Sequence, residues 1–270
     1  MQTTTTVIIL HYGDPEITKN SLTHLAPKLT QYPLIIVNNT TQDISSFKKI
    51  IPKLKIINNH QNLGFAKGVN RGIKLALRNS QTDSILLLNN DLTLTFGNIS
   101  HLRKTLFYQS NIGLVAPVLH HSGNLYDWGG RYNPWLAMVK HQNFKQKPKR
   151  PIKVDHVAGA AMLIRRQVLE EVGLFDERFF LYYEDLDFCL RLKKAGYQII
   201  IDPEVVAEHQ ISASSSPLGR TFYQWHSHLK FIFKHLLSFQ VYPTALIYDL
   251  IFYPVVTLKL LIKNLISLKS

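Results

Sequence analysis

The sequence predicts an α/β protein in which a mostly parallel sheet is flanked by helices and followed by a helical C-terminal extension. Three observations support this fold class. The first half alternates short β-branched runs with amphipathic segments, which is typical of a parallel sheet covered by helices. Beyond about residue 216 the chain changes to long apolar and aromatic patterns with helical spacing. With 270 residues, 46% of them hydrophobic, the chain can form a sizeable core.

The individual elements follow from these patterns. The predicted strands are residues 6–12, 34–38, 54–58, 84–88 and 113–117, and the predicted helices are 17–29, 44–51, 64–79 and 98–109. Polar residues follow three of these strands: His11 and Gly13, then Asn38 and Asn39, then Asn89, Asn90 and Asp91. Ligands of open α/β sheets bind at the carboxyl ends of the strands. We therefore expect a ligand crevice lined by these side chains.

The chain is strongly basic, with a formal net charge of +13. This charge indicates an anionic partner, which could be nucleic acid, a nucleotide diphosphate or an acidic membrane surface. The basic residues are dispersed and no nucleic-acid recognition motif is present, which argues against nucleic acid. We expect no nucleic-acid partner.

Cysteine usage and the N-terminus bear on location. The single cysteine, Cys189, excludes a disulfide framework and a cysteine-type zinc site, and it fits a reducing compartment. The N-terminal residues lack a basic region, and the apolar run that follows them is too short for a signal peptide. These features predict a cytoplasmic protein.

Residues 173–196 carry a concentration of aromatic and acidic side chains. An aromatic run, 179–183, directly precedes Glu184, Asp185 and Asp187, and helical spacing then continues to a stop at Gly196. The carboxylates could simply stabilise the helix N-terminus, by about 0.3–1 kcal/mol each. Alternatively, one is a general base. Glu184 and Asp187 share a helix face while Asp185 points away from Asp187, so the three cannot serve one site. Carboxylate neighbours and the aromatic wall should raise the pKa of that base.

Two further segments could bind an anionic ligand. Leu86-Leu-Leu-Asn-Asn-Asp91 places a carboxylate where a divalent ion and a diphosphate could meet, although the same string also makes an ordinary turn. Residues 62–72 open a helix with two small residues that let the backbone approach a ligand, and they place Lys67 and Arg71 near its start. The spacing matches neither a P-loop nor a dinucleotide-binding fingerprint, which argues against NAD binding and ATP hydrolysis.

Several other features allow two interpretations. Residues 140–153 hold six basic residues and no acid, as expected of a solvated loop or of a contact with phosphate or an anionic headgroup. Trp128 and Trp135 could stack on a sugar or complete a hairpin core, whereas His120 and His121 are expected at the surface. Residues 159–162 could enter a buried strand.

The C-terminal stretch 241–266 is rich in Leu, Ile and Tyr. Its interruptions are Pro243, Asp249, Pro254, Lys259 and Lys263. A spanning helix needs about 20 predominantly apolar residues, so we favour an interfacial helix on an anionic membrane over a spanning one. The lysines expected to face anionic lipid are Lys230, Lys234, Lys259, Lys263 and Lys269. The alternative is an ordinary helix packed on the domain or in a dimer.

Together these segments resemble the family 2 glycosyltransferases of the GT-A fold, in particular the bacterial rhamnosyltransferase-like branch. The resemblance covers about residues 5–235 and rests on the order and spacing of its motifs: Val37-Asn-Asn-Thr40, residues 62–72, Leu88-Asn-Asn-Asp91, residues 157–165, residues 173–187, and His209. It implies a Rossmann-like catalytic domain over residues 1–215. The nucleotide-sugar half would cover about 1–118, the acceptor half about 119–215, and a helical, membrane-associated extension 216–270.

The resemblance also implies roles for single residues. Asp91 would hold Mg²⁺ or Mn²⁺ with His209, with Asn89 standing where a strict Asp-x-Asp motif has its first acid, and Asp185 would be the base. His209 could equally be structural. The donor-binding residues would be His11, Gly13, Asn38, Asn39, Asn62, Gly64, Phe65, Lys67, Asn70, Asn90 and Asp91. The acceptor and sugar site would include Gly159, Ala160, Ala161, Glu184 and Trp128.

The implied reaction is inverting transfer of a sugar from a nucleotide-sugar donor to a hydroxyl group. The donor would be dTDP-rhamnose or a UDP- or GDP-sugar, and the acceptor a glycan or a lipid-linked glycan of the cell envelope. The enzyme would work on the inner face of the cell membrane. Two alternatives remain: a nucleotidyltransferase, and an inactive sugar-nucleotide-binding homologue, which Asn89 and Asn38 suggest.

Overall fold

The computed structural model of the chain describes residues 3–122, 124–141, 148–210, 217–236 and 242–267. The strands are β1 (Thr4–His11), β2 (Leu34–Asn38), β3 (Lys55–Asn58), β4 (Thr82–Asn89), β5 (Leu92–Phe96), β6 (Ile112–His121), β7 (Asn124–Asp127), β8 (Gly130–Asn133), β9 (Met138–His141), β10 (Ile152–Val154), β11 (Ala161–Arg165) and β12 (Gln198–His209). The helices are α1 (Pro15–Leu29), the 3₁₀ helix η1 (Ser45–Lys49), α2 (Phe65–Ala76), α3 (Ile99–Leu106), α4 (Arg166–Glu171), α5 (Glu184–Lys194), α6 (Pro217–Leu236) and α7 (Thr244–Ser267).

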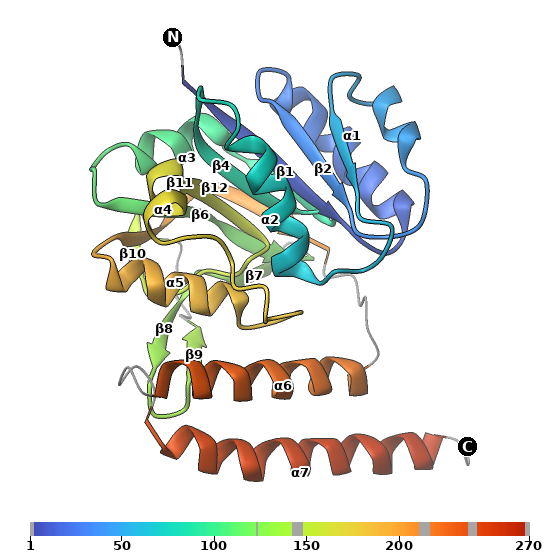
Figure 1. The fold of residues 1–270 in the computed structure, drawn as a ribbon, viewed down its shortest axis with the longest axis vertical. Coiled ribbons are helices and arrows are strands. Elements are labelled where there is room, and N and C mark those ends of the chain that lie inside the picture. The colour runs from blue at the N-terminus through green and yellow to red at the C-terminus, as the bar shows by residue number, and fades with distance from the viewer. Residues whose placement is uncertain (1–2, 123, 142–147, 211–216, 237–241, 268–270) are drawn as a thin grey trace.

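One twisted sheet organises the molecule (Figure 1). Its strand order over the described residues is β10-β12-β6-β11-β4-β1-β2-β3, with β5 added to β12 and β7 added to β6. β4, β1, β2 and β3 are mutually parallel, as are β6 and β12, whereas β11 runs antiparallel between β4 and β6. Leu10 on β1 pairs with both Val37 on β2 and Asn89 on β4. The carboxyl ends of three strands therefore meet at one edge.

Helices cover both faces of the sheet, which explains why β1, β2 and β4 are buried almost along their whole length. On one face the core includes Leu22 and Leu25 from α1, Phe47 from η1 and Leu102 from α3. On the other face the core is made by α2, α4 and α5. A third cluster joins Leu186 and Leu190 of α5 to Phe231 and Ile232 of α6 and Ala245 of α7. α6 and α7 thus form an extra layer beneath α5 (Figure 1).

The elements predicted in the first half are found close to their predicted positions. The prediction of a helix over 44–51 was wrong in type, because the chain forms only a short 3₁₀ helix there. Phe47 is its buried side chain, and Ile44, which directly precedes it, is also buried. Residues three apart lie in line on a 3₁₀ helix, and Pro52 follows directly. The strand predicted over 113–117 extends to ten residues as β6.

The basic stretch 140–153 is only partly a loop. Lys140 and His141 end β9, and Lys153 belongs to β10. Residues 142–147 lie outside the described part of the chain, so the prediction of a loop there stays a prediction. His120 and His121, expected at the surface, are half-buried at the end of β6, where the His121 ring bonds the carbonyl of His209 (2.9 Å).

The C-terminal helix pair, α6 and α7, runs antiparallel (Figure 1). His228 of α6 bonds Asp249 of α7 (Nδ1 to Oδ1, 2.6 Å), and Trp225 stacks on Tyr253. Over Thr244–Ile262, α7 has a mean hydropathy of 1.8 and is long and apolar enough to cross a membrane by length and composition alone, with 17% of that stretch buried.

Two predicted lipid-facing lysines instead turn toward α5 and the segment that precedes it. The Lys234 ammonium lies 2.6 Å from Asp176 and 2.5 Å from Asp187, and the Lys230 ammonium donates to the Arg178 carbonyl. Lys259 is exposed on α7. The Lys263 side chain and Lys269 lie outside the described residues.

Glycines allow α2 to pack closely on the sheet. A Cβ atom on Gly68 would lie 2.7 Å from Leu10 Cδ1, and one on Gly72 would lie 2.7 Å from Ile8 Cγ2. These small residues of the 62–72 segment therefore serve helix–strand packing and do not admit a ligand. Gly64, at the start of the same segment, is different because it lines a cavity.

Gly72→Val should destabilise the fold by roughly 1–3 kcal/mol, because its side chain would overlap Ile8 and the Val37 Cγ2 atom in a packed core. Urea unfolding at neutral pH measures this loss. Lys74→Ala on the same helix is the control, since Lys74 is exposed, and it should change the free energy of unfolding by about 0.5 kcal/mol or less. Equal stability of the two variants would contradict the packing role of Gly72.

Candidate active site

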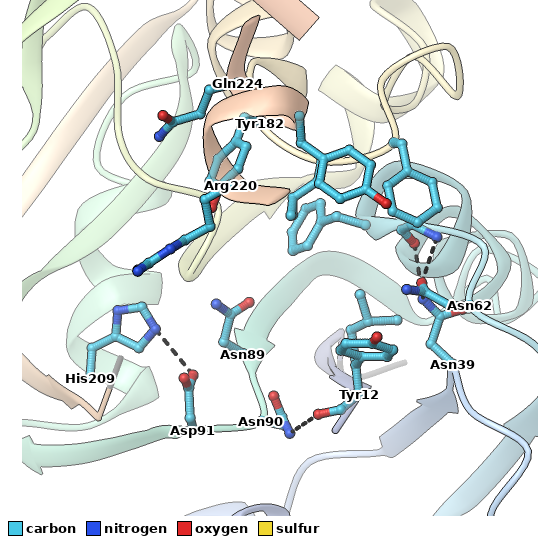
Figure 2. Close-up of a pocket in the computed structure, with 16 residues that line it drawn as sticks. Tyr12, Asn39, Asn62, Asn89, Asn90, Asp91, Tyr182, His209, Arg220 and Gln224 are labelled. Atoms are coloured by element: carbon cyan, nitrogen blue, oxygen red, sulfur yellow. Dashed lines mark hydrogen bonds and ion pairs between the residues drawn. The ribbon is translucent and has the colours of Figure 1, made fainter. Parts of the chain in front are cut away.

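A cavity of about 540 Å³ opens at the carboxyl ends of β1, β2 and β4, where the sequence predicts the crevice (Figure 2). Its lining also includes residues 180–182, His209 at the end of β12, and α6. The lining residues are Leu10, Tyr12, Asn39, Asn62, Gly64, Phe65, Asn89, Asn90, Asp91, Phe180, Leu181, Tyr182, His209, Arg220, Tyr223 and Gln224.

Asp91 and His209 form one corner of the cavity. β5 pairs with the end of β12, so that Leu92 lies opposite His209, and the Gln210 N–H donates to the Asp91 carbonyl (2.9 Å). This register places His209 Nε2 3.1 Å from Asp91 Oδ1 (Figure 2). A carboxylate oxygen and an imidazole nitrogen suit a divalent ion that takes its remaining ligands from phosphate and water.

No group of three or more His, Cys, Asp or Glu side chains that could hold a metal ion is found within the described residues. A metal at the Asp91–His209 corner would therefore depend on the bound ligand for most of its coordination.

Asn90 is positioned by a chain of hydrogen bonds that begins at His11. The His11 ring bonds the Thr18 hydroxyl (Nδ1 to Oγ1, 2.7 Å), and Asn90 Nδ2 donates to the same hydroxyl (2.8 Å) and to the Tyr12 carbonyl (3.0 Å). His11 itself is fully buried against Phe47, and this burial lowers its pKa to about 4, with Asp14 acting weakly in the opposite direction. His11 thus supports the site from behind and does not line it.

Asn39 ties the start of α2 to the cavity. Its amide nitrogen donates to Asn62 Oδ1 (3.0 Å) and to the Gly64 carbonyl (3.1 Å), while its oxygen accepts from Asn59 and from the Leu63 N–H. Gly64 has φ of 79°, and a Cβ atom there would lie 2.4 Å from the Phe180 carbonyl oxygen. Only glycine fits at this position, because residues 62–65 touch the backbone before α5.

Five predicted donor-binding residues lie off the cavity lining: His11, as described above, and Gly13, Asn38, Lys67 and Asn70. Asn38 is 2% exposed. Its amide nitrogen donates to the Gln42 carbonyl and to Asn58 Oδ1, and its amide oxygen accepts from the N–H and hydroxyl of Thr40. Asn70 is buried and exchanges two hydrogen bonds with the Phe175 backbone, which fastens segment 173–187 to α2. Lys67 and Gly13 are exposed.

Two consecutive residues before α5 adopt left-handed backbone conformations. Tyr182 has φ of 67° and Tyr183 has φ of 69°. Tyr182 lines the cavity, and the Tyr183 ring stacks on His228 of α6 at 4.9 Å. The turn therefore sends one tyrosine into the cavity and the other into the interface with α6, and α5 begins directly after it at Glu184.

The three carboxylates at the start of α5 do not share one site, as their helical spacing predicts. Asp187 is fully buried and pairs with Arg191, Lys234 and His235. Glu184 is 5% exposed, and burial, aided by the charge of Asp185, raises its pKa well above the usual value. Asp185 keeps 21% of its side chain exposed.

Asp185 does not have the raised pKa that the sequence predicts. Burial acts to raise the pKa, but His156 and the N–H groups of Gly159 and Leu186 outweigh it, so the pKa lies below the usual value. Asp185 Oδ2 accepts from the Gly159 N–H (3.0 Å) and lies 3.4 Å from His156 Nε2. The raised pKa belongs to its neighbour Glu184.

Asp185 lies next to the cavity without lining it. A Cβ atom on Gly159 would lie 3.2 Å from the ring of Phe65, which lines the cavity, and 3.7 Å from the Asp185 Cβ. Gly159 therefore lies between the Phe65 wall of the cavity and Asp185. Ala160 and Ala161 are buried where the chain enters β11, and the Ala160 carbonyl accepts from the Asn89 N–H (2.8 Å).

Trp128 and Trp135, the two tryptophans considered as sugar contacts, do not line the cavity. Trp128 is 2% exposed within the core, so it offers no ring face to a sugar, and the hairpin-core interpretation fits it. Trp135 is 55% exposed and stacks on Tyr242 at 4.1 Å.

Several residues of the site were missed at the level of sequence. Arg220, Tyr223 and Gln224 reach the cavity from α6 (Figure 2), although the change of composition near residue 216 suggested a separate extension. Tyr12 and His156 were also missed. The position of Tyr12 directly after a strand could have indicated it, whereas no sequence pattern marks His156.

Comparison with known proteins identifies the family. A family model described as Glycosyl transferase family 2 matches residues 6–173, which is more than half of the chain, and one described as Glycosyl transferase family group 2 matches residues 97–267. The chain belongs to glycosyltransferase family 2. The family indicated by its motifs is thereby confirmed.

Curated relatives of this family 2 glycosyltransferase include named sugar transferases. It is 25% identical to the low-salt glycan biosynthesis hexosyltransferase Agl10 of Haloferax volcanii, over 72% of this chain and 62% of the relative. It is 25% identical to rhamnosyltransferase WbbL of Escherichia coli K12, over 85% of this chain and 91% of the relative. It is 26% identical to the N-acetylglucosaminyl-diphospho-decaprenol L-rhamnosyltransferase of Mycobacterium tuberculosis, over 61% of each chain.

Solved structures of low sequence identity share the fold. GalNAc-T7, solved with UDP, GalNAc and Mn²⁺, superimposes with a TM-score of 0.68 at 14% identity, over 86% of this chain and 48% of that one. The mannosyltransferase PcManGT of Pyrobaculum calidifontis, in complex with GDP-Man and Mn²⁺, gives 0.64 at 13% identity, over 95% and 72%. The predicted GT-A architecture is confirmed.

The burial of His11 predicts a pH-dependent loss of stability. Its pKa is about 4 in the folded chain and 6.5 in the reference state, so between these values the unfolded chain binds the extra proton and stability falls as the pH falls. From pH 7.5 to pH 5 the wild type should lose about 2 kcal/mol through this residue.

Urea unfolding of the wild type and of His11→Asn at both pH values measures this effect, because the amide does not titrate. His24→Asn is the control, since His24 lies exposed on α1, and it should lose as much stability as the wild type. The same pH dependence in His11→Asn and in the wild type would refute the assignment.

Proposed function

We propose that this chain is an inverting glycosyltransferase that moves a sugar from a nucleotide-sugar donor to a hydroxyl group of a glycan or lipid-linked acceptor. One observation carries the proposal. A single cavity has the Asp91–His209 pair at one corner and, at its Phe65 wall, the Gly159 backbone that holds Asp185. A site for diphosphate charge and a candidate base thus lie beside one sugar-sized space.

The donor diphosphate would bind near Asp91, His209 and Arg220. Arg220 contributes a fixed positive charge from α6, and His209 already pairs with Asp91. Mg²⁺ or Mn²⁺ held by Asp91 and His209 would neutralise charge on the leaving diphosphate. Both structural neighbours were solved with Mn²⁺, which supports this role.

The names of the relatives favour one class of donor. Rhamnosyl transfer is named in the relatives from Escherichia coli, Mycobacterium tuberculosis and Shigella flexneri, and the last of these is named a dTDP-rhamnosyl transferase. We therefore place dTDP-rhamnose first among the donors, before UDP- and GDP-sugars. Because the two structural neighbours were solved with UDP and with GDP-Man, UDP- and GDP-sugars are included in the donor assay below.

Asp185 would accept the proton of the acceptor hydroxyl. Its lowered pKa keeps the carboxylate ionised at neutral pH, which is the form a base requires. The deprotonated oxygen would attack the anomeric carbon from the face opposite the diphosphate, while the bond from that carbon to the diphosphate oxygen breaks. A single displacement of this kind inverts the configuration, by the same stereochemical logic that separates one-step from two-step glycosidases.

Asp185→Asn should lower turnover by about 10²–10⁴-fold and leave donor binding unchanged. The measurement is nucleoside diphosphate release from dTDP-, UDP- and GDP-sugars with an N-acetylglucosaminyl-diphospho-polyprenol acceptor, with Mg²⁺, with Mn²⁺ and with EDTA. Asp43→Asn is the matched control because Asp43 hydrogen-bonds only within its own turn.

Activity of Asp185→Asn equal to the wild type would exclude Asp185 as the base. Release of pyrophosphate in place of a nucleoside diphosphate would favour a nucleotidyltransferase. Donor binding without turnover of any donor would favour the inactive homologue.

The C-terminal helix pair is proposed to rest on the membrane that carries the acceptor. One face of α7 is apolar and exposed, at 45–63% of each side chain, and consists of Ile247, Leu250, Ile251, Val255, Leu258, Leu261 and Ile262. These positions recur at three- and four-residue intervals and form one stripe. The only acid on the described parts of α6 and α7 is Asp249, which is buried against His228.

The same contacts favour a helix that lies in the plane of the membrane over one that spans it. Asp249 and Tyr253 hold α7 along α6, and α6 in turn packs on α5 and lines the cavity. A spanning α7 would have to leave α6 and expose the buried Asp249–His228 pair to lipid, which is costly. An in-plane α7 keeps its contact with α6, keeps the Asp249–His228 pair buried, and buries the apolar stripe in the membrane.

The double variant Leu250→Glu/Leu258→Glu should lose binding to vesicles that contain anionic phosphatidylglycerol, because it places two charges in the apolar stripe. Vesicle co-sedimentation at low and high salt measures this binding, which should be weaker at high salt in the wild type. Tyr108→Glu is the control on the distant α3 side, where Tyr108 is 78% exposed. Undiminished binding of the double variant would exclude this surface.

A further inference from the structure

The base candidate Asp185 has a buried neighbour that the reaction described above does not use. His156 precedes β11, and its side chain is 7% exposed. Its Nε2 lies 3.4 Å from Asp185 Oδ2. Its Nδ1 is buried and has no hydrogen-bond partner among the described residues. We propose that His156 is a positioning residue that holds Asp185 as an oriented carboxylate and leaves Oδ1 to receive the acceptor proton.

This inference rests on the proposed function, in which Asp185 is the base. The choice of Oδ1 follows from counting lone pairs. A carboxylate offers about four acceptor positions, two on each oxygen. Oδ2 accepts from the Gly159 N–H at 3.0 Å and lies in ion-pair range of His156 Nε2, at 3.4 Å. Among the described residues, Oδ1 accepts only from the Leu186 N–H, at 2.8 Å. The remaining position is therefore on Oδ1.

The unpartnered Nδ1 argues against a packing role alone. A buried polar atom without a partner destabilises the fold, and an apolar ring would fill the same space without that cost. His156 is also held through its backbone, whose N–H donates to the Gly130 carbonyl (3.2 Å) and whose carbonyl accepts from the Gly130 N–H (3.0 Å). These bonds do not depend on the side chain, so the ring can be replaced while the backbone stays in place.

The charges around Asp185 leave His156 as its side-chain partner. Its own helix carries Glu184 and Cys189, and burial raises the pKa of both side chains. Tyr183 before the helix also has a pKa raised by burial. From β9, His141 faces the ring of His156 edge-on at 6.3 Å, but it pairs with Asp127 of β7 at 3.1 Å.

Two variants separate charge from geometry. His156→Gln keeps an N–H donor that can reach Oδ2 without a ring charge, whereas His156→Phe removes the donor and fills the space. In His156→Phe, the acid limb of kcat should move to higher pH by roughly 1 unit, because the pKa of Asp185 rises. Its kcat at neutral pH should fall roughly 10-fold, a part of the 10²–10⁴-fold that a positioned base contributes.

In His156→Gln, kcat at high pH should fall less than in His156→Phe, and the acid limb of its pH profile should shift less. The donor Kd, measured by calorimetry, should stay within about twofold of the wild-type value in both variants. His24→Gln is the control, because that exposed histidine bonds only its own helix, and it should behave as the wild type.

A readout without turnover completes the test. ¹³C-carboxyl NMR, with the Asp185 signal assigned by its loss in Asp185→Asn, should show a higher pKa for Asp185 in His156→Phe. An unchanged Asp185 titration and an unchanged pH profile would overturn the inference. A parallel fall in stability and donor affinity without either shift would also overturn it and leave His156 as packing. Activity of Asp185→Asn would instead refute the proposed function, so the two failures are distinguishable.

Discussion

The left-handed turn at Tyr182 and Tyr183 is the constraint on which the site depends. Two consecutive non-glycine residues with positive φ cost about 1–2 kcal/mol each, so the surroundings must hold them. The Ser227 hydroxyl donates to the Leu181 carbonyl (2.7 Å), and Tyr183 stacks on His228, whose two ring nitrogens bond Asp249 and the Leu136 carbonyl. The turn thereby directs Tyr182 to the cavity and sets the start of α5, where Asp185 lies.

This arrangement makes the C-terminal helix pair part of the structure that forms the cavity. α6 lines the cavity through Arg220, holds the turn through His228, and neutralises Asp187 through Lys234. The last contact explains why Lys234 does not face lipid. α7 supports α6 with its buried side and leaves its apolar stripe outward. A membrane that binds the stripe would therefore lie against the layer that shapes the active site.

Much of the fold could be predicted because its physical causes are local. β-branched runs and amphipathic spacing located the strands and helices of the first half, and the polar residues after three strands located the cavity. Asn39, Asn90 and Asp91 were found in this way. Asn38 and Asn70 have the same chemistry but bond inward, which spacing alone does not reveal. Segment 44–51 was misjudged because apolar residues three apart suit an α-helix and a 3₁₀ helix equally.

The sequence by itself determined the α/β class, the crevice at the strand ends and the separation of Asp185 from Asp187 on α5, since periodicity and chain order decide these. Only the tertiary structure decided which groups share a site. The β5–β12 register brings His209 to Asp91 across more than a hundred residues, and the docking of α6 brings Arg220. The pKa of Asp185 was likewise decided by His156 and the Gly159 N–H. Electrostatic environment depends on distance in space, and no local pattern encodes it.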